Sequence, residues 1–243
     1  MILYPAIDIL EGHAVRLVQG RFEDSTVYHD DPVAAAQSWV DAGARFLHVV
    51  DLDGARSGTP RSIEHLRRIA SETGVPVQYG GGLRSLQAVR EALRAGAERV
   101  IVGTAALRDV DFLDEILAAY GPRVVVSVDV RGGKIATAGW TQVTDMPAAD
   151  AIRRLHDRGV ASFVYTDADR DGALEGPSLD DVGTIAGAVR GRFLYAGGVG
   201  RLEHLRALRA LRQVNLSGVI VGKALYERRF TVAEAQAALD GKE

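Results

Sequence analysis

The sequence of 243 residues contains no cysteine. This absence excludes disulfide bonds, thiolate nucleophiles and metal sites that need cysteine ligands. The chain also has no apolar run near the ~20 residues that a membrane-spanning helix requires. We therefore expect neither cysteine chemistry nor a membrane partner.

A strong charge of one sign is also missing. The net charge is −3, and the 29 basic and 32 acidic residues are scattered along the chain without a basic tract. Nucleic acid is therefore not expected as a partner. The first apolar stretch lacks a basic leader and contains Asp8, so we expect no signal peptide, a cytoplasmic location and, in the absence of any partner signal, a monomer.

Short apolar runs rich in β-branched residues alternate with amphipathic segments along the whole chain. The runs read continuously apolar, as strands buried on both faces do. We predict strands near 2–8, 45–50, 76–79, 99–102, 123–129, 161–166, 193–196 and 218–221. We predict helices near 32–42, 61–73, 85–95, 109–119, 147–157, 178–188, 202–211 and 231–239.

Eight strand–helix units without a linker favour a closed (β/α)₈ barrel, of the α/β class, over an open doubly wound sheet. Barrels of this length are routinely one domain, so we expect a single domain over residues 1–243. Asp31 before Pro32 predicts the start of the first helix, and Ser85 is the expected cap of the third. Pro147 is expected at the first position of the fifth helix.

The chain also shows an internal repeat of half its length. Matching segments lie about 116 to 121 residues apart, which gives halves of about 1–121 and 122–243. Asp8 ends the apolar run 2–7, and Asp129 ends the run 124–128, a separation of 129 − 8 = 121 residues. In a (β/α)₈ barrel these aspartates end strands 1 and 5, which face each other across the mouth where active sites gather. We therefore predict that both are catalytic.

Glycine-rich turns are repeated in the same way after the third, fourth, seventh and eighth predicted strands. Glycine lets the backbone approach a ligand, and N–H groups at a helix start suit a phosphate. The repeat predicts two phosphate sites and hence a small-molecule substrate with a phosphate at each end. The candidate residues are Gly81, Gly82, Gly103 and Thr104 in the first half, and Gly197, Gly198, Gly222 and Lys223 in the second.

Several stretches together resemble the ProFAR isomerase family of histidine biosynthesis. They are Ala6–Ile9 with Gly12, Arg16–Gly20, Thr26–Tyr28, His48–Ala55, Gly80–Arg84, Gly139–Trp140 and Thr166–Gly172. The resemblance runs in order from residue 1 to about Glu227. It implies a cofactor-independent Amadori rearrangement, in which a phosphoribosyl aminoaldose becomes its aminoketose.

The resemblance also assigns roles to particular residues. It implies that Asp8 is the base, that Asp129 is the acid and that Thr166 hydrogen-bonds the opened sugar or orients a carboxylate. An acid that works near neutral pH needs a raised pKa, from burial or from neighbouring negative charge.

Six further residues are candidates for substrate binding. Arg16 is expected to pair with substrate or with Asp8, and Trp140 to stack on the imidazole carboxamide. The remaining candidates are His48, Arg84, Asp171 and Gly172. The other histidines lack ligand spacing, so no metal is expected.

Three alternatives stay open. The sister cyclase of the same pathway carries a lysine where this chain has Arg16. A dual-substrate isomerase that also accepts phosphoribosylanthranilate has an arginine beside the tryptophan, whereas this chain reads Ala136 to Gly139 before Trp140. A non-catalytic phosphate-binding barrel would keep the glycines but need neither aspartate.

Overall fold

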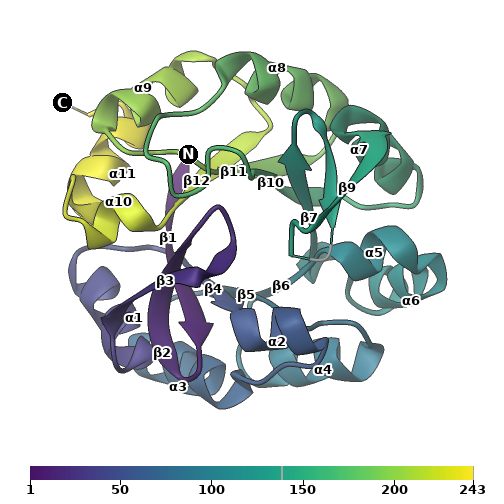
Figure 1. The fold of residues 1–243 in the computed structure, drawn as a ribbon, viewed down its shortest axis with the longest axis horizontal. Helices are drawn as coiled ribbons and strands as arrows, with labels where there is room; N and C mark the ends of the chain where they lie inside the picture. Colours follow the sequence, from purple (N-terminus) through teal and green to yellow (C-terminus); the bar gives the residue numbers. More distant parts are fainter. Residues whose placement is uncertain (138, 243) are drawn as a thin grey trace.

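Eight parallel strands close into a ring in the computed structural model, which describes residues 1–137 and 139–242 (Figure 1). The order around the ring is β1, β4, β5, β6, β7, β10, β11 and β12, and β12 pairs with β1. The strands are β1 (Ile2–Leu10), β4 (Leu47–Asp51), β5 (Val77–Gly80), β6 (Arg99–Val102), β7 (Val124–Arg131), β10 (Ser162–Asp167), β11 (Arg192–Ala196) and β12 (Leu216–Val221). The predicted (β/α)₈ barrel is confirmed, and each predicted strand is present.

Helices surround this ring and cover its outer face (Figure 1). They are α1 (Pro32–Asp41), α3 (Ile63–Thr73), α4 (Leu86–Arg94), α6 (Val110–Tyr120), which is followed by the 3₁₀ turn η1 (Gly121–Arg123), α7 (Ala148–Asp157), α8 (Leu179–Ala188), α9 (Leu202–Ala210) and α11 (Val232–Asp240). Asp31 caps α1 by accepting from the Val33 amide at 2.9 Å, and Ser85 caps α4, as predicted. Pro147 is instead the last residue of a strand and precedes α7, so its predicted place inside the helix was wrong by one position.

Apolar side chains fill two regions. A large cluster lies between the strands and the helices, and it includes Ile7, Leu47, Tyr79 and Phe193, all essentially fully buried. A smaller cluster fills the inside of the barrel, with Tyr4, Ala6, Ile101, Val125, Val164, Leu194, Ala196 and Ile220. Burial on both faces explains the continuously apolar strand sequences.

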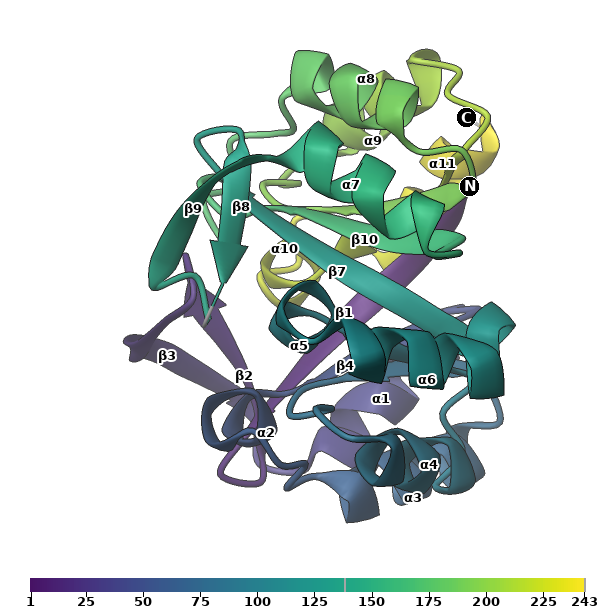
Figure 2. The same cartoon turned by 90° about the vertical axis from the view of Figure 1, so that its right-hand side faces the viewer.

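Two antiparallel hairpins, which the sequence reading missed, extend from the ring. The first is β2 (His13–Val18) with β3 (Arg21–His29), and the second is β8 (Lys134–Thr137) with β9 (Gln142–Pro147). Both project from the same end of the barrel (Figure 2). The strands β7 and β8 join through Gly132 and Gly133, with φ of 57° and 75°, as a two-residue hairpin turn requires. Such a glycine pair between two apolar runs was the available signal.

Three short helices, also missed, begin where barrel strands end: α2 (Leu52–Ser57), α5 (Thr104–Arg108) and α10 (Lys223–Tyr226). The strand ends, the hairpins and these short helices surround one opening of the barrel, which we call the mouth.

No helix among the described residues has the length and apolar character that crossing a bilayer would take.

Gly81 shows how tightly the loops at the mouth pack. Its φ is +111°, and a Cβ there would collide with the backbone carbonyl oxygen of Asp51. Gly43 has a similar φ of +99°, but a Cβ there would meet nothing within 4 Å. The two glycines therefore separate the cost of the backbone conformation from the cost of the collision.

We expect Gly81→Ala to lower the free energy of unfolding by about 2–3 kcal/mol, against about 1 kcal/mol for Gly43→Ala. Urea denaturation of both variants measures the difference. Equal losses would mean that the loop after β5 moves aside without cost.

Candidate active site

Asp8 and Arg16 form a buried ion pair at the mouth. Asp8 lies near the end of β1, and its side chain is only 12% exposed. Arg16 lies on β2, which folds back along β1, and its Nη1 donates to Asp8 Oδ2 at 2.7 Å. Burial raises the pKa of Asp8, and the positive charge of Arg16 opposes that shift. Of the two expected partners for Arg16, the structure shows the aspartate.

Asp129 lies on the opposite side of the mouth, on β7, four places from β1 around the ring. Ser127 and Asp129 are two residues apart on β7, so their side chains lie on the same face of the strand. The Ser127 hydroxyl donates to Asp129 Oδ1 at 2.7 Å. Thr166 on β10 is the register partner of Asp129 and is buried. The structure thus places the three predicted catalytic residues at the strand ends around the mouth.

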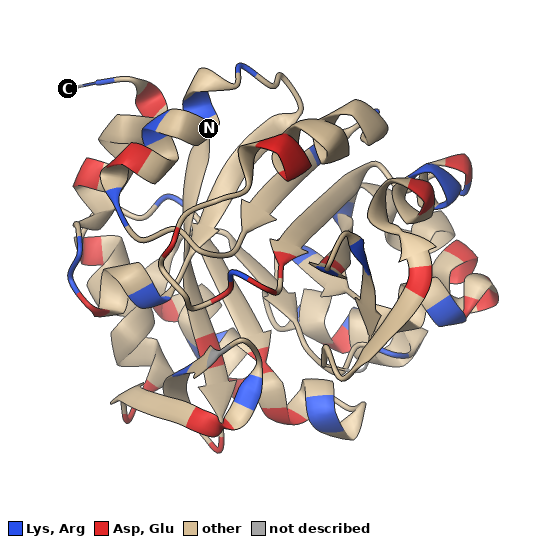
Figure 3. Cartoon of the chain, turned by 45° about the horizontal axis from the view of Figure 1, so that its top comes forward, with Lys and Arg blue, Asp and Glu red and all other residues tan. Residues whose placement is uncertain are grey.

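Asp171 adds a third carboxyl to this region. It follows β10 in a loop that lies across the mouth, and its carbonyl accepts from the Gln19 amide at 3.3 Å. Burial raises the pKa of Asp171 to about 6, against the lowering effect of Arg16 and with a further increase from the negative charges of Asp8 and Asp129. Acidic and basic segments adjoin each other on the loops in the middle of Figure 3. With a pKa of about 6, the carboxyl of Asp171 is partly protonated near neutral pH, as a general acid has to be.

The second-half candidates gather around one small cavity. Gly197, Gly198, Gly222 and Lys223 line it together with Arg16, Asp171 and Gly172. Lys223 Nζ donates to the Gly172 carbonyl at 3.1 Å, and the Arg16 guanidinium lies against Gly222, where a Cβ would collide with it. Seven predicted residues thus share one basic, glycine-rich cavity.

The first-half candidates do not line that cavity. Gly81 and Gly82 follow β5 with φ of +111° and +73°, close to the +115° and +71° of Gly197 and Gly198. A Cβ at Gly82, Gly197 or Gly198 would lie within 2.7 Å of a backbone oxygen of a neighbouring loop. The need for glycine at these positions is therefore explained by packing within the chain. Gly103 and Thr104 start α5, as Gly222 and Lys223 start α10.

A cleft of about 660 Å³ opens beside the first hairpin. Trp140 and Arg84 line it, with Gln19, Gly20, Arg21, Phe22, Glu23, Ala55, Arg56, Arg131, Gly139, Thr141 and Asp169. The Trp140 ring packs against Gly20, where a Cβ would lie 2.7 Å from it. Arg84 donates to the Ala55 carbonyl at 2.9 Å. The two residues thus lie in one cleft, and Trp140 joins the two hairpins.

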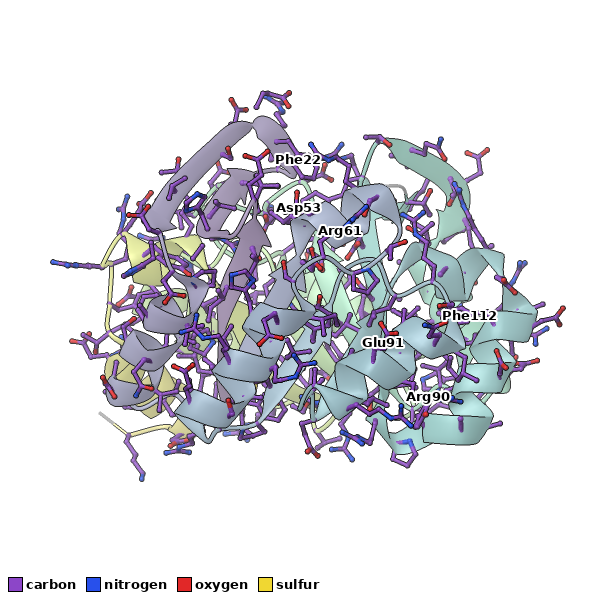
Figure 4. All side chains as sticks on the ribbon, turned by 90° about the horizontal axis from the view of Figure 1, so that it is seen from below. Phe22, Asp53, Arg61, Arg90, Glu91 and Phe112 are labelled. Atoms are coloured by element: carbon purple, nitrogen blue, oxygen red, sulfur yellow. The ribbon has the colours of Figure 1, made fainter. Side chains whose placement is uncertain are left out.

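The first hairpin and the turn that precedes it both contact α2. The Glu11 amide donates to Asp53 Oδ2 at 2.6 Å, and the Arg56 guanidinium lies 5.5 Å from the centre of the Phe22 ring. In Figure 4, Phe22, Asp53 and Arg61 lie at the hairpin end of the molecule, away from Arg90 and Glu91 on the helical ring. The hairpin is therefore held beside the mouth.

His48 lies inside the barrel and is 8% exposed. Its Nδ1 is 2.7 Å from Gln78 Nε2, and burial with the charges of Arg16 and Arg99 lowers the pKa of His48 to about 3. A group of three or more acidic or histidine side chains suited to a metal ion is not found among residues 1–137 and 139–242.

Comparisons with known proteins give the same assignment along the whole chain. The family model described as "Histidine biosynthesis protein" matches residues 2–231. The chain belongs to this family. The relative from Desulforudis audaxviator is 46% identical over 243 residues, which cover all of this chain and 92% of that protein. The relative from Roseiflexus castenholzii is 45% identical, and the alignment covers 98% of this chain and 99% of that protein.

Both relatives, and one from Brevibacillus brevis that is 43% identical over 242 residues, carry the same name. It is 1-(5-phosphoribosyl)-5-((5-phosphoribosylamino)methylideneamino) imidazole-4-carboxamide isomerase, the enzyme that acts on ProFAR. The resemblance predicted from the motifs is thereby confirmed, and the sister cyclase is not favoured.

Sequence reasoning missed that the negative charges of Asp8 and Asp129 act on Asp171. It also missed Gln78 beside His48 and the fully buried Asp51, which accepts from Tyr79 Oη and from the amides of Gly54, Arg61 and Ser62. A polar residue inside an otherwise apolar strand, such as Gln78, was the visible signal.

Proposed function

We propose that this chain isomerises ProFAR, the bisphosphorylated aminoaldose on which its relatives act, to the corresponding aminoketose. The observation that carries the proposal is the opposition of Asp8 and Asp129 at the ends of strands that face each other across the mouth. A non-catalytic phosphate-binding barrel has no need of a buried carboxylate there, and burying a charge is costly.

The reaction needs an acid and a base on the two sides of the sugar. The acid protonates the furanose ring oxygen, the ring C–O bond breaks and a Schiff base forms. The base then removes the C2 proton, and the enolamine that results tautomerises to the ketone. Asp8 is the proposed base, because burial raises its pKa and so strengthens it as a proton acceptor.

Two residues are candidates for the acid. Asp129 is the residue that the family pattern implies. Asp171 is the second candidate, because its pKa of about 6 leaves a usable protonated fraction near neutral pH. Thr166, next to Asp129 in the register, is proposed to hydrogen-bond the opened sugar.

The two phosphates are proposed to bind at the two glycine-rich regions. Arg16 and Lys223 supply positive charge at the cavity with Gly172, Gly197, Gly198 and Gly222, which supports one phosphate there. The turns at Gly81, Gly82, Gly103 and Thr104 are proposed for the other. Trp140 and Arg84, which share the cleft, are proposed to contact the imidazole carboxamide end.

The organisation of the molecule completes the proposal. We infer one domain built of two half-barrels, about 1–121 and 122–243, because Gly81 and Gly82 repeat the φ angles of Gly197 and Gly198. We also propose that the enzyme is a monomer in the cytoplasm, and sedimentation velocity measures the oligomeric state.

Incubating the purified protein with ProFAR while following the absorbance change tests the activity itself. Binding of ProFAR without turnover would contradict the proposal and favour a binding protein.

Substrate range gives a sharper test. We expect turnover of ProFAR and little or none of phosphoribosylanthranilate, which replaces the second ribose phosphate by a benzoate. A cation has to reach that carboxylate, and the described part of the 135–139 loop has none; Ala138 lies outside the described residues. Arg131 lines the cleft, but its Nε is held 3.3 Å from Asp169 Oδ1. Comparable kcat/KM values for both substrates would contradict this expectation and indicate a dual-substrate isomerase.

A further inference from the structure

A chain of three polar side chains crosses the otherwise apolar interior of the barrel. Arg99, Gln78 and His48 lie on the adjacent strands β6, β5 and β4, where Gln78 is the register partner of each of the other two. Arg99 Nη2 donates to Gln78 Oε1 at 2.8 Å, and Gln78 Nε2 lies 2.7 Å from His48 Nδ1. The chain ends at His48, the register partner of Ala6 on β1, two residues before Asp8.

The chemistry of the three groups fixes the direction of these hydrogen bonds. A guanidinium has only donors, so Arg99 has to face the carbonyl oxygen of the Gln78 amide. The amide nitrogen of Gln78 then faces His48, and because it too is a donor, His48 Nδ1 has to accept. A neutral imidazole that accepts at Nδ1 carries its proton on Nε2.

Arg99 itself is held firmly in place. Its guanidinium lies 4.6 Å from the centre of the Phe46 ring and 5.6 Å from that of Tyr4, and Nη2 also donates to the Tyr4 hydroxyl at 3.1 Å. Cation–π contacts of this kind fix the plane of a guanidinium. The far end of the chain is therefore rigid.

The sister half of the barrel shows that the fold does not need this polar chain. By the repeat offset of 116 residues, Val164 and Leu194 stand where the first half has His48 and Gln78, and both are buried in the barrel interior. By the offset of 119 residues, Gly218 stands in the place of Arg99. Buried polar groups give no general gain in stability over apolar ones. The polar copy in one half therefore points to a role in the site.

We propose that Arg99 and Gln78 are positioning residues, which fix His48 as the neutral tautomer with its proton on Nε2, so that it donates a hydrogen bond to the substrate. This inference rests on the proposed function and extends it to residues on the neighbouring strands β5 and β6. His48 is then a binding and polarising group that neither takes up nor releases a proton in the reaction. Its pKa of about 3 keeps it neutral throughout the working pH range.

The tautomer is measured directly on the protein without substrate. Two-bond ¹H–¹⁵N correlation spectra of protein labelled with ¹⁵N-histidine distinguish a protonated from an unprotonated ring nitrogen, and His48→Asn identifies the signals of His48 among the six histidines. We expect an unprotonated Nδ1 and a protonated Nε2 between pH 5 and 9. A proton on Nδ1 in the wild-type protein would overturn the proposal.

Gln78→Glu tests the link to Gln78. A carboxylate has no N–H, so it still pairs with Arg99 but makes His48 Nδ1 a donor, and the tautomer should reverse. We expect kcat/KM to fall about 10- to 100-fold, the usual loss when one hydrogen-bond donor to a substrate is removed. A reversed tautomer with kcat/KM within twofold of wild type would overturn the role in the reaction.

Two substitutions at Arg99 form a matched pair. Lysine also has only donors, so Arg99→Lys should keep the wild-type tautomer, whereas Arg99→Leu releases the Gln78 amide and should give a mixture of tautomers. The same tautomer in both variants would overturn the part assigned to Arg99. Because the spectra need no substrate, failure of the wild-type protein to turn over ProFAR would refute the proposed function without affecting this measurement.

Discussion

Asp8→Asn is expected to lower kcat by about 10²–10⁴-fold while leaving substrate affinity largely intact, since removal of a general base typically has an effect of this size. Asparagine keeps the shape of the side chain and a hydrogen-bonding oxygen for Arg16, which lies 2.7 Å from the carboxylate. What it loses is the ability to accept a proton from C2. Steady-state kinetics with ProFAR give kcat, and equilibrium titration with substrate gives the affinity.

Asp109→Asn is a suitable control. Asp109 accepts from the Phe112 amide at 2.9 Å as the cap of α6, on the outside of the barrel. Asparagine caps helices about as well as aspartate, so this variant should match wild type in both stability and rate. Wild-type turnover in Asp8→Asn would mean that the base lies elsewhere. An equal loss of kcat in Asp109→Asn would show that the lower rate arises from the preparation of the variants and not from the loss of a base.

The barrel was predictable because its signals are local. A strand buried on both faces has to be apolar throughout, and a helix that covers it needs one apolar stripe and a cap such as Asp31 or Ser85. Each of these requirements is met within about ten residues of sequence. The order of eight such units, with matched halves, then left few alternatives to closure.

The hairpins and the charge environment were harder to predict, because they depend on contacts between distant segments. The strand β3 is largely polar and mostly exposed, so it lacks the apolar pattern that marks a barrel strand. The pKa of Asp171 is raised by its burial and, against the lowering effect of Arg16 on β2, by the negative charges of Asp8 on β1 and Asp129 on β7, which lie more than 40 residues away in sequence. The resemblance placed Asp171 near substrate without indicating its proton affinity.

Phosphate binding was predicted because glycine lets a ligand approach the backbone, but the structure gives another reason for these glycines. The Gly-Gly turns were expected to admit a ligand, whereas the missing Cβ atoms of Gly81 and Gly197 make room for backbone oxygens of Asp51 and Asp167. Those two aspartates are themselves 167 − 51 = 116 residues apart. The repeat is therefore first of all a repeat of loop packing, and the proposed phosphate sites lie at these packed loops.

The second large effect concerns the acid, and it separates Asp129 from Asp171. A group that must be protonated to act gives a rate that falls as the pH rises through its pKa, so an Asp171 acid predicts a decline in kcat/KM above about pH 6. We expect Asp171→Asn to lower kcat/KM by about 10²-fold or more at low pH and to abolish that decline. We expect Asp129→Asn to lower the profile at every pH while keeping the decline.

Two pH profiles together distinguish the titration of Asp171 from that of a group far from the substrate. The profile of kcat/KM reports the free enzyme and that of kcat reports the complex with substrate. A phosphate bound in the cavity beside Asp171 adds negative charge and raises its pKa further, so the decline in kcat should lie at higher pH than the decline in kcat/KM. If Asp129→Asn, and not Asp171→Asn, abolishes the decline, the proton comes from Asp129 as the family pattern implies. In that case the proximity of Asp171 to Arg16 and Lys223 serves to hold the loop after β10 over the bound sugar.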